Sequence, residues 1–363
     1  MEDAYIDELI SNYNYTVLFD VLYRSTWEYR VQQKFATFMP PPLIIIGTLG
    51  NILCCVMFRR CQLHREATGF FMVCLCLVNS IILFTGCGLH WISHMTHTPY
   101  IANLTDWTCR VWQCFFNILL YSSPWLVVAM VIERYIFLFH PKARNALCSI
   151  FAAKVCLIII TVGLLCVAVH ALWTYELNTV ADQCYVDQEL HFFHTKVWPW
   201  ISAVVYLYLP VLTLLVFQLF IVLALLPSDC HPSRVSQSGP HNSKLTKATL
   251  VVSVIYVVLI LPTIIVNLLE YCKPSLTHAP DSYAKLTLVR VIGQNLACLD
   301  HSVTFIVFYA YFPALLRETS DLLCCVHCKG VTRQSQEYHL TSIECTAEEL
   351  SEDNREAKNC TMV

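Results

Sequence analysis

The sequence predicts an all-α membrane protein: a bundle of seven membrane-spanning helices followed by a short amphipathic helix on the cytoplasmic side. The chain has 363 residues, of which 56% are hydrophobic and only 13% are charged, and its mean hydropathy is +0.55. A soluble protein of this length carries nearer a quarter charged residues. The charges lie in short segments between long apolar runs, as in a multi-span membrane protein.

Each apolar run is long enough to cross a hydrocarbon core of about 30 Å as a helix. The seven runs cover approximately residues 41–58, 69–93, 111–133, 150–173, 197–226, 248–269 and 286–312. They divide the chain into an N-terminal segment (1–40), the seven-span bundle (41–317) and a C-terminal tail (318–363). The acidic start lacks the basic and apolar regions of a cleavable signal peptide, so we expect the first span to target the chain to the membrane.

The loops between the spans indicate the orientation, because Lys and Arg are enriched on the cytoplasmic side. The first, third and fifth connections are basic, whereas the second and fourth carry little more than Arg110 and Lys196. The odd-numbered connections are therefore expected in the cytoplasm and the N-terminus outside the cell, and an odd number of spans puts the two ends of the chain on opposite sides. Glycosylation sequons at Asn14 and Asn103 fall on this outer side.

The third span carries distinctive residues at both of its ends. Cys109 opens it, and the triplet Glu133, Arg134 and Tyr135 closes it. Arg134 follows Cys109 by 25 residues, which is roughly 37 Å along a helix. An arginine at the membrane face is costly unless it is paired, and Glu133 is an available partner. The alternative is an arginine that merely anchors the helix by extending to the interface.

Seven spans, an outside N-terminus and Glu-Arg-Tyr at the end of span three together resemble the rhodopsin-like (class A) G-protein-coupled receptors. The resemblance covers roughly residues 40–330 and includes further motifs in the family's order: Gly50-Asn51, Cys109 with Cys184, His140-Pro141, Pro210 and Pro262. It implies a plasma-membrane receptor, not an enzyme, that binds an extracellular ligand and activates a heterotrimeric G protein. It also implies a disulfide bond between Cys109 and Cys184 and a G-protein switch at Glu133, Arg134 and Tyr135.

The chain departs from the family pattern in several spans. Span two has Asn79 where the family has aspartate, span five has Gln218 for a tyrosine, and span six has Ile260 for a tryptophan. Span seven lacks the family's N-P-x-x-Y, and its segment D-H-S-V-T-F is most similar to invertebrate FMRFamide-type peptide receptors. These departures leave open the possibility that the chain is an atypical receptor of the same fold, with constitutive or weak signalling.

The outer ends of the spans favour a peptide ligand. The family's amine receptors carry an aspartate about seven residues after the span-three cysteine, where this chain has Phe116. A wide polar and aromatic mouth instead suits a peptide, whose terminus or charged side chain would meet Arg290 or Glu270. The candidate ligand-binding residues are Gln113, Phe116, Asn117, Asn267, Glu270, Arg290 and Gln294.

Asp300 is the only acidic residue deep in span seven, and burying it unpaired in a membrane is expensive. With Asn51, Asn79 and Ser123 it could form the oxygen-lined site that holds sodium in this family. The alternative is a protonated Asp300 that hydrogen-bonds to its neighbours. No other cofactor or metal is expected. A transporter or channel would carry charged residues at mid-depth in several spans, and here Asp300 is essentially the only one. The net charge of −3 argues against binding to nucleic acid.

The tail carries three further predictions. Its first part is amphipathic, which suits a helix lying on the lipid bilayer, and Cys324, Cys325 and Cys328 are palmitoylation candidates or plain thiols. Serines and threonines near acidic residues would recruit arrestin once phosphorylated, as tails in this family do. The end Thr361-Met362-Val363 fits the pattern that a PDZ domain accepts.

Overall fold

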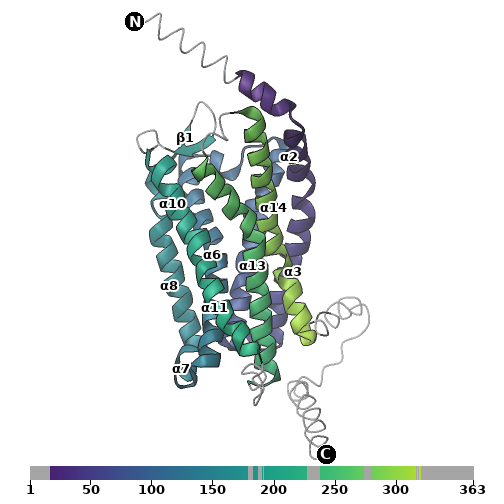
Figure 1. The fold of residues 1–363 in the computed structure, drawn as a ribbon, viewed down its shortest axis with the longest axis vertical. Helices are drawn as coiled ribbons and strands as arrows, with labels where there is room; N and C mark the ends of the chain where they lie inside the picture. The colour runs from purple at the N-terminus through teal and green to yellow at the C-terminus, as the bar shows by residue number, and fades with distance from the viewer. Residues whose placement is uncertain are drawn as a thin grey trace, which may run out of the picture. The chain divides into compact units, whose positions relative to one another are not determined.

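The structure, a computed structural model, describes residues 17–178, 183–186, 190, 192–226, 238–273, 279–315, 317 and 319. Within this part of the chain, seven helices are long and apolar enough to cross a membrane, which confirms the predicted seven-span helical bundle (Figure 1). They are Trp27–Arg60, Ala67–Thr96, Asp106–Phe139, Ile150–Thr174, Trp198–Leu225, Pro240–Glu270 and Pro280–Tyr311. We refer to them as spans one to seven.

Span one begins well before the predicted residue 41. It consists of α2 (Trp27–Phe38) and α3 (Pro40–Arg60), which meet at Met39. A proline is well tolerated in the first turn of a helix, so the prolines that follow Met39 start α3 rather than extend α2. The earlier helix packs on span seven, where Gln32 Nε2 donates to the carbonyl oxygen of Ala284 at 3.0 Å.

Spans two, four and five are each built from more than one helical segment. Span two is α4 (Ala67–Ile82), the π turn η2 (Leu83–Gly88) and α5 (Leu89–Thr96). Span four is α8 (Ile150–Ala168) and α9 (Ala171–Thr174). Span five is α10 (Trp198–Ala203), η6 (Val204–Tyr208) and α11 (Leu209–Leu225), preceded by η5 (Phe193–Val197).

Spans three, six and seven are long single helices. They are α6 (Asp106–Phe139), α13 (Pro240–Cys272) and α14 (Pro280–Tyr311). The described connections contain η1 (Leu63–Arg65), η3 (Ile101–Asn103) and α7 (Pro141–Leu147), together with an antiparallel hairpin of β1 (Tyr175–Asn178) and β2 (Gln183–Val186). In the hairpin, Tyr175 lies opposite Val186 and Leu177 opposite Cys184.

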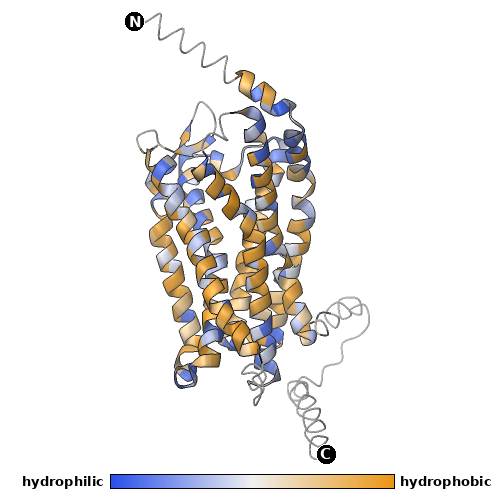
Figure 2. Ribbon diagram, viewed as in Figure 1, coloured by the Kyte–Doolittle hydropathy of each residue, from blue (hydrophilic) through white to orange (hydrophobic). Residues whose placement is uncertain are grey.

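Helix α6 is the centre of the bundle, since it contacts α4, α8, α11 and α13. Its side chains from Leu126 to Val131 are all buried. Apolar side chains also cover the outside of the helices, and Figure 2 shows orange along the spans with blue gathered at their ends. Phe151 and Ile159 on α8 are 75% and 66% exposed. Because lipid tails are as apolar as these side chains, such a surface is stable only within a bilayer.

Candidate functional site

One end of α6 is fixed to the β-hairpin, and we call this the hairpin end of the bundle. Cys109, which is completely buried, forms a disulfide bond with Cys184, and the two Cα atoms are 5.4 Å apart. The backbone N–H of Cys184 donates to Asn103 Oδ1 at 3.0 Å, and that of Leu177 donates to Asp106 Oδ1 at 3.1 Å. The disulfide bond and these hydrogen bonds hold the hairpin in place.

The predicted ligand residues lie at or below this end, and two of them pair with each other. Arg290 on span seven donates to Glu270 on span six, forming an ion pair between these spans. Gln113 Nε2 lies 3.9 Å from Cys184 Sγ, directly beneath the hairpin. The ring of Phe116 contacts Gly86 of span two so closely that a Cβ at residue 86 would lie 2.7 Å from it.

Three other predicted ligand residues have side chains that make no hydrogen bond to the described residues. Within the described part of the chain, no hydrogen bond is made by the side chains of Asn117, Asn267 and Gln294, and Gln294 is exposed. These polar groups are available to a bound molecule. The hairpin end thus combines free hydrogen-bonding groups with a charged pair that a ligand could exchange, but it contains no group of three or more potential metal ligands among the described residues.

An aromatic cluster that contains two histidines lies behind the hairpin. The ring of His194 is 5.6 Å from that of His170 and 4.9 Å from that of Tyr175. Burial, with a smaller contribution from His170, lowers the pKa of His194 below its ordinary value. Burial raises the pKa of Tyr175. Both groups are therefore neutral at physiological pH, and we expect the cluster to support the hairpin.

The four residues predicted to share a sodium site divide between two places. Asn79 Oδ1 accepts from Ser123 Oγ at 3.1 Å and from His301 Nδ1 at 2.9 Å. Asn51 Nδ2 donates to the carbonyl oxygen of His301 at 2.9 Å. An amide oxygen can only accept, so His301 carries its proton on Nδ1. His301, which the sequence reasoning missed, is the centre of this network.

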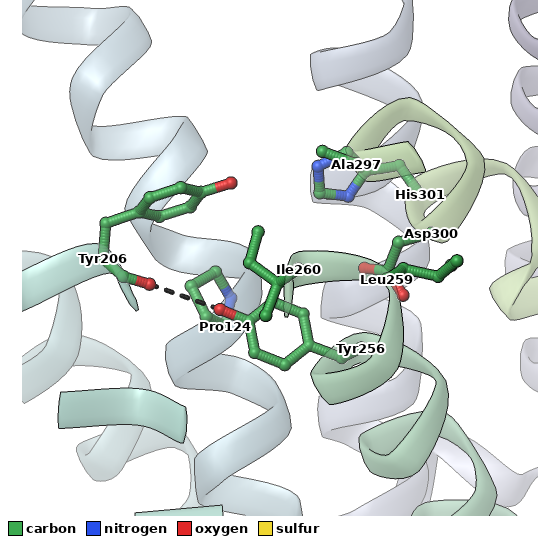
Figure 3. A pocket seen from close by; sticks show the side chains of 8 residues that line it. All are labelled: Pro124, Tyr206, Tyr256, Leu259, Ile260, Ala297, Asp300 and His301. Atoms are coloured by element: carbon green, nitrogen blue, oxygen red, sulfur yellow. Dashed lines mark hydrogen bonds between the residues drawn. The ribbon is translucent and has the colours of Figure 1, made fainter. Parts of the chain in front are cut away.

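Asp300 lines a different space. The cavity beside it has a volume of about 10 Å³, which is room for roughly one water molecule. It is surrounded by Pro124, Tyr206, Tyr256, Leu259, Ile260, Ala297, Asp300 and His301 (Figure 3). The Tyr256 hydroxyl donates to the carbonyl oxygen of Tyr206 at 3.2 Å. No hydrogen bond to the Asp300 carboxylate is found among the described residues.

The geometry places the predicted sodium-site residues in two neighbouring sites, and the sodium site stays a prediction. Successive residues on a helix point about 100° apart, so the imidazole of His301, rather than the carboxylate of Asp300, reaches Asn79. The Asn79 network has no carboxylate, and one of its oxygens already accepts two hydrogen bonds. The cavity at Asp300 is lined by four apolar residues, one of them Pro124, and by Tyr206, Tyr256, Asp300 and His301.

The opposite end of α6, which we call the Arg134 end, contains a buried ion pair. Arg134 and Glu133 are 3% and 5% exposed. Arg134 Nε donates to Glu133 Oε2 at 2.7 Å, and Nη2 donates to Oε1 at 2.6 Å. Thr68 Oγ1 of span two also donates to Glu133 Oε2. Tyr135 points elsewhere and packs on Phe217 of span five, with ring centroids 4.9 Å apart.

Span six offers Arg134 no acidic partner, since residues 240–269 contain no Asp or Glu. Its end is connected to span two in another way. His241 Nε2 lies 2.8 Å from Oε1 of Glu66, the residue that precedes α4. Both side chains are partly exposed. The His241–Glu66 contact thus links the start of span six to the start of span two at the Arg134 end. No motif in the sequence predicted it.

Several predicted sites lie outside the described residues. These are the sequon at Asn14, the palmitoylation candidates Cys324, Cys325 and Cys328, and the terminal Thr361, Met362 and Val363. The second sequon is described. Asn103 uses its side-chain oxygen to hold Cys184, and Thr105 begins α6 by accepting from the N–H of Thr108 at 3.1 Å. The Asn103 nitrogen, to which a glycan would be attached, makes no recorded hydrogen bond in the described structure.

Residues 50–312 match the 7 transmembrane receptor (rhodopsin family). Among curated proteins, the chain is 21% identical over 100 residues to neuromedin-U receptor 2 of Homo sapiens, covering 28% of this chain and 24% of that protein. It is 24% identical over 113 residues to C-C chemokine receptor type 1 of Homo sapiens, covering 30% and 31%. It is 26% identical over 109 residues to the thyrotropin-releasing hormone receptor of Gallus gallus, covering 30% and 27%. The aligned segments thus span about a quarter to a third of these relatives.

Proposed function

Because the chain belongs to the rhodopsin family of seven-transmembrane receptors, we propose that it is a plasma-membrane receptor that activates a heterotrimeric G protein. The hairpin end and the N-terminus would face outward, and the Arg134 end would face the cytoplasm. One observation carries the proposal: α6 has a disulfide-fixed end and, at its other end, a fully buried pair of Glu133 and Arg134. A buried ion pair with one exchangeable partner is a two-state element.

The resting arrangement is the one in which Glu133 accepts from both Arg134 and Thr68. In the active arrangement, Arg134 would leave this site and meet the G protein. A ligand can shift the balance only if it binds the two arrangements with different affinity. The mechanism therefore requires that the outer ends of the spans rearrange when the ligand binds.

We infer that the ligand is a peptide. The relatives named above are receptors for neuromedin U, C-C chemokines and thyrotropin-releasing hormone. The ion pair of Arg290 and Glu270 supports the same inference, because a ligand carboxylate could replace Glu270 on Arg290. Such an exchange would separate span six from span seven at their outer ends, which couples binding to helix movement. The similarity to FMRFamide-type receptors stays a prediction within this proposal.

A peptide library that includes peptides with C-terminal Arg-Phe-amide tests the proposal, with G-protein activation in cells as the readout. For a ligand with a carboxylate, Arg290→Gln should lower potency by roughly 10- to 150-fold, the value of a charge-assisted hydrogen bond. Glu270→Gln, which leaves Arg290 free, should not lower potency. If Glu270→Gln lowers potency and Arg290→Gln does not, the ligand carries a cationic group instead.

Two outcomes would overturn the proposal. If neither variant changes potency at matched surface expression, the ion pair is not part of the ligand site. If no peptide activates any G protein and the protein instead carries ionic currents, the chain is a channel with this fold. Arrestin binding, palmitoylation of the tail and capture by a PDZ domain are parts of the proposal that need separate tests in cells.

A further inference from the structure

A second disulfide bond joins two membrane-spanning helices, and the family motifs in this sequence do not predict it. Cys87 in η2 of span two is bonded to Cys298 in α14, 211 residues later. Other cysteines in the spans stay unbonded even where several gather: Cys54, Cys55, Cys74 and Cys76 are all free. The pairing of Cys87 with Cys298 is therefore selective.

The π turn of span two places Cys87 at this position. The N–H of Leu89 bonds to the carbonyl oxygen of Phe84, five residues back, so the segment holds one residue more than an α-helical turn. Gly86 allows the turn to lie against the ring of Phe116, where a larger residue would collide. The π turn is thus packed on span three while Cys87 reaches span seven. Such turns are frequent at functional sites.

The bond lies directly below the predicted ligand residues. Cys298 follows Gln294 by one helical turn, and Cys87 is next to Gly86, which contacts Phe116. Deeper in the bundle, the hydrogen bond of His301 to Asn79 joins the same two spans again. Spans two and seven are therefore connected covalently near the ligand mouth and by hydrogen bonds at mid-depth.

We propose that the Cys87–Cys298 disulfide is a covalent control site that holds span seven against span two and sets the response of the receptor to its ligand. The inference rests on the proposed receptor function. The bond ties η2 of span two to α14 of span seven, so it limits how far these two spans can move apart.

The bond forms by thiol–disulfide exchange with a small or protein disulfide of the secretory pathway. The thiolate of one cysteine attacks the oxidant and forms a mixed disulfide, and the other thiolate then displaces the remaining oxidant sulfur. The Cys87–Cys298 bond replaces the oxidant's S–S bond. The two electrons and two protons that the cysteines lose leave with the oxidant, which departs as two thiols.

The first test needs neither a variant nor signalling. The full-length receptor is purified after its free thiols are blocked, digested without reductant and analysed by mass spectrometry. We expect one peptide pair that links Cys87 to Cys298 and another that links Cys109 to Cys184. Recovery of Cys87 and Cys298 as blocked free thiols would overturn the proposal, even if the protein proves to be a working receptor.

The second test is a double-mutant cycle in G-protein activation, with basal activity and ligand potency normalised to surface expression. Cys87→Ser, Cys298→Ser and the double variant should change one of these readouts by the same factor, on the order of fivefold or more. Cys74→Ser and Cys156→Ser, at free cysteines of similar partial burial, should leave both readouts unchanged.

Two results of the cycle would overturn the control role. One is that the effects of the two single variants add in the double variant, since independent packing changes behave in that way. The other is that all three variants signal like the native receptor. If the serine variants do not reach the surface, the cycle is repeated with alanine, and the mass-spectrometric result decides whether the bond exists. A receptor with the bond but without G-protein activity would contradict the proposed function instead.

Discussion

Replacing Glu133 with Gln should raise ligand-independent signalling strongly. The carboxylate of Glu133 accepts two hydrogen bonds from Arg134 and one from Thr68 in a site where both charged side chains are at least 95% buried. A glutamine keeps one acceptor, directs an NH₂ group at the guanidinium and leaves that charge unpaired. Hydrogen bonds to charged groups contribute about 1.5–3 kcal/mol. The resting arrangement should lose roughly this amount relative to one in which Arg134 leaves the site.

That loss corresponds to a shift of roughly 10- to 150-fold in the equilibrium. A receptor whose active arrangement is populated at about 1% would then reach roughly 10–60%. Basal G-protein activation at matched surface expression measures the shift. Thr68→Val is the matched control, because it removes one donor from the same carboxylate but keeps both hydrogen bonds from Arg134, so it should raise basal activity less than Glu133→Gln does. Unchanged basal activity in Glu133→Gln, or a larger effect of Thr68→Val, would refute the reasoning.

Three further predictions concern residues outside the spans or at their ends. His241→Ala and Glu66→Gln should each raise basal activity by no more than about fivefold, because a partly exposed contact of this kind contributes about 0–1 kcal/mol, and the double variant should add nothing. Burial raises the pKa of Cys148 to about 12, so iodoacetamide at pH 7.5 should label it much more slowly than the exposed Cys272; equal rates would contradict its burial. Burial lowers the pKa of His194 in the folded protein, so protonation of this ring favours the unfolded state. The stability that depends on the neutral ring is present above about pH 6.5, the ordinary pKa of histidine. It is lost as the pH falls through the lower pKa of the folded state. The melting temperature of the purified receptor should therefore drop more between pH 7.5 and 5.5 than that of His194→Gln, and equal drops would exclude His194.

The number and order of the spans could be predicted from the sequence because they depend on a local property. An apolar run of sufficient length has to cross the bilayer as a helix, whatever it packs against. The predicted start of span one at residue 41 was late, because α2 contains polar side chains such as Gln32 that its contact with Ala284 satisfies. A hydropathy pattern cannot register such a contact.

The candidate site was predictable where the chemistry of one residue requires a particular partner. A charged Arg134 in a membrane requires an adjacent counter-charge, and Glu133 is the next residue along the chain. The pairing of Cys109 with Cys184 followed from the family resemblance, and the structure contains that bond. The residue that contacts Asn79 is His301 rather than Asp300, because the rotation of about 100° per residue directs the imidazole there.

The sequence by itself thus determined the seven spans, the family and the residues whose charge demands a neighbour. Only the tertiary structure decided which distant residues meet. Thr68 reaches Glu133, His241 reaches Glu66, and Cys87 bonds to Cys298 because of how far each helix is rotated and shifted against the next one. Rotation and shift are set by the packing of many side chains at once, and for Cys87 by a single π turn. No local pattern in the chain records them.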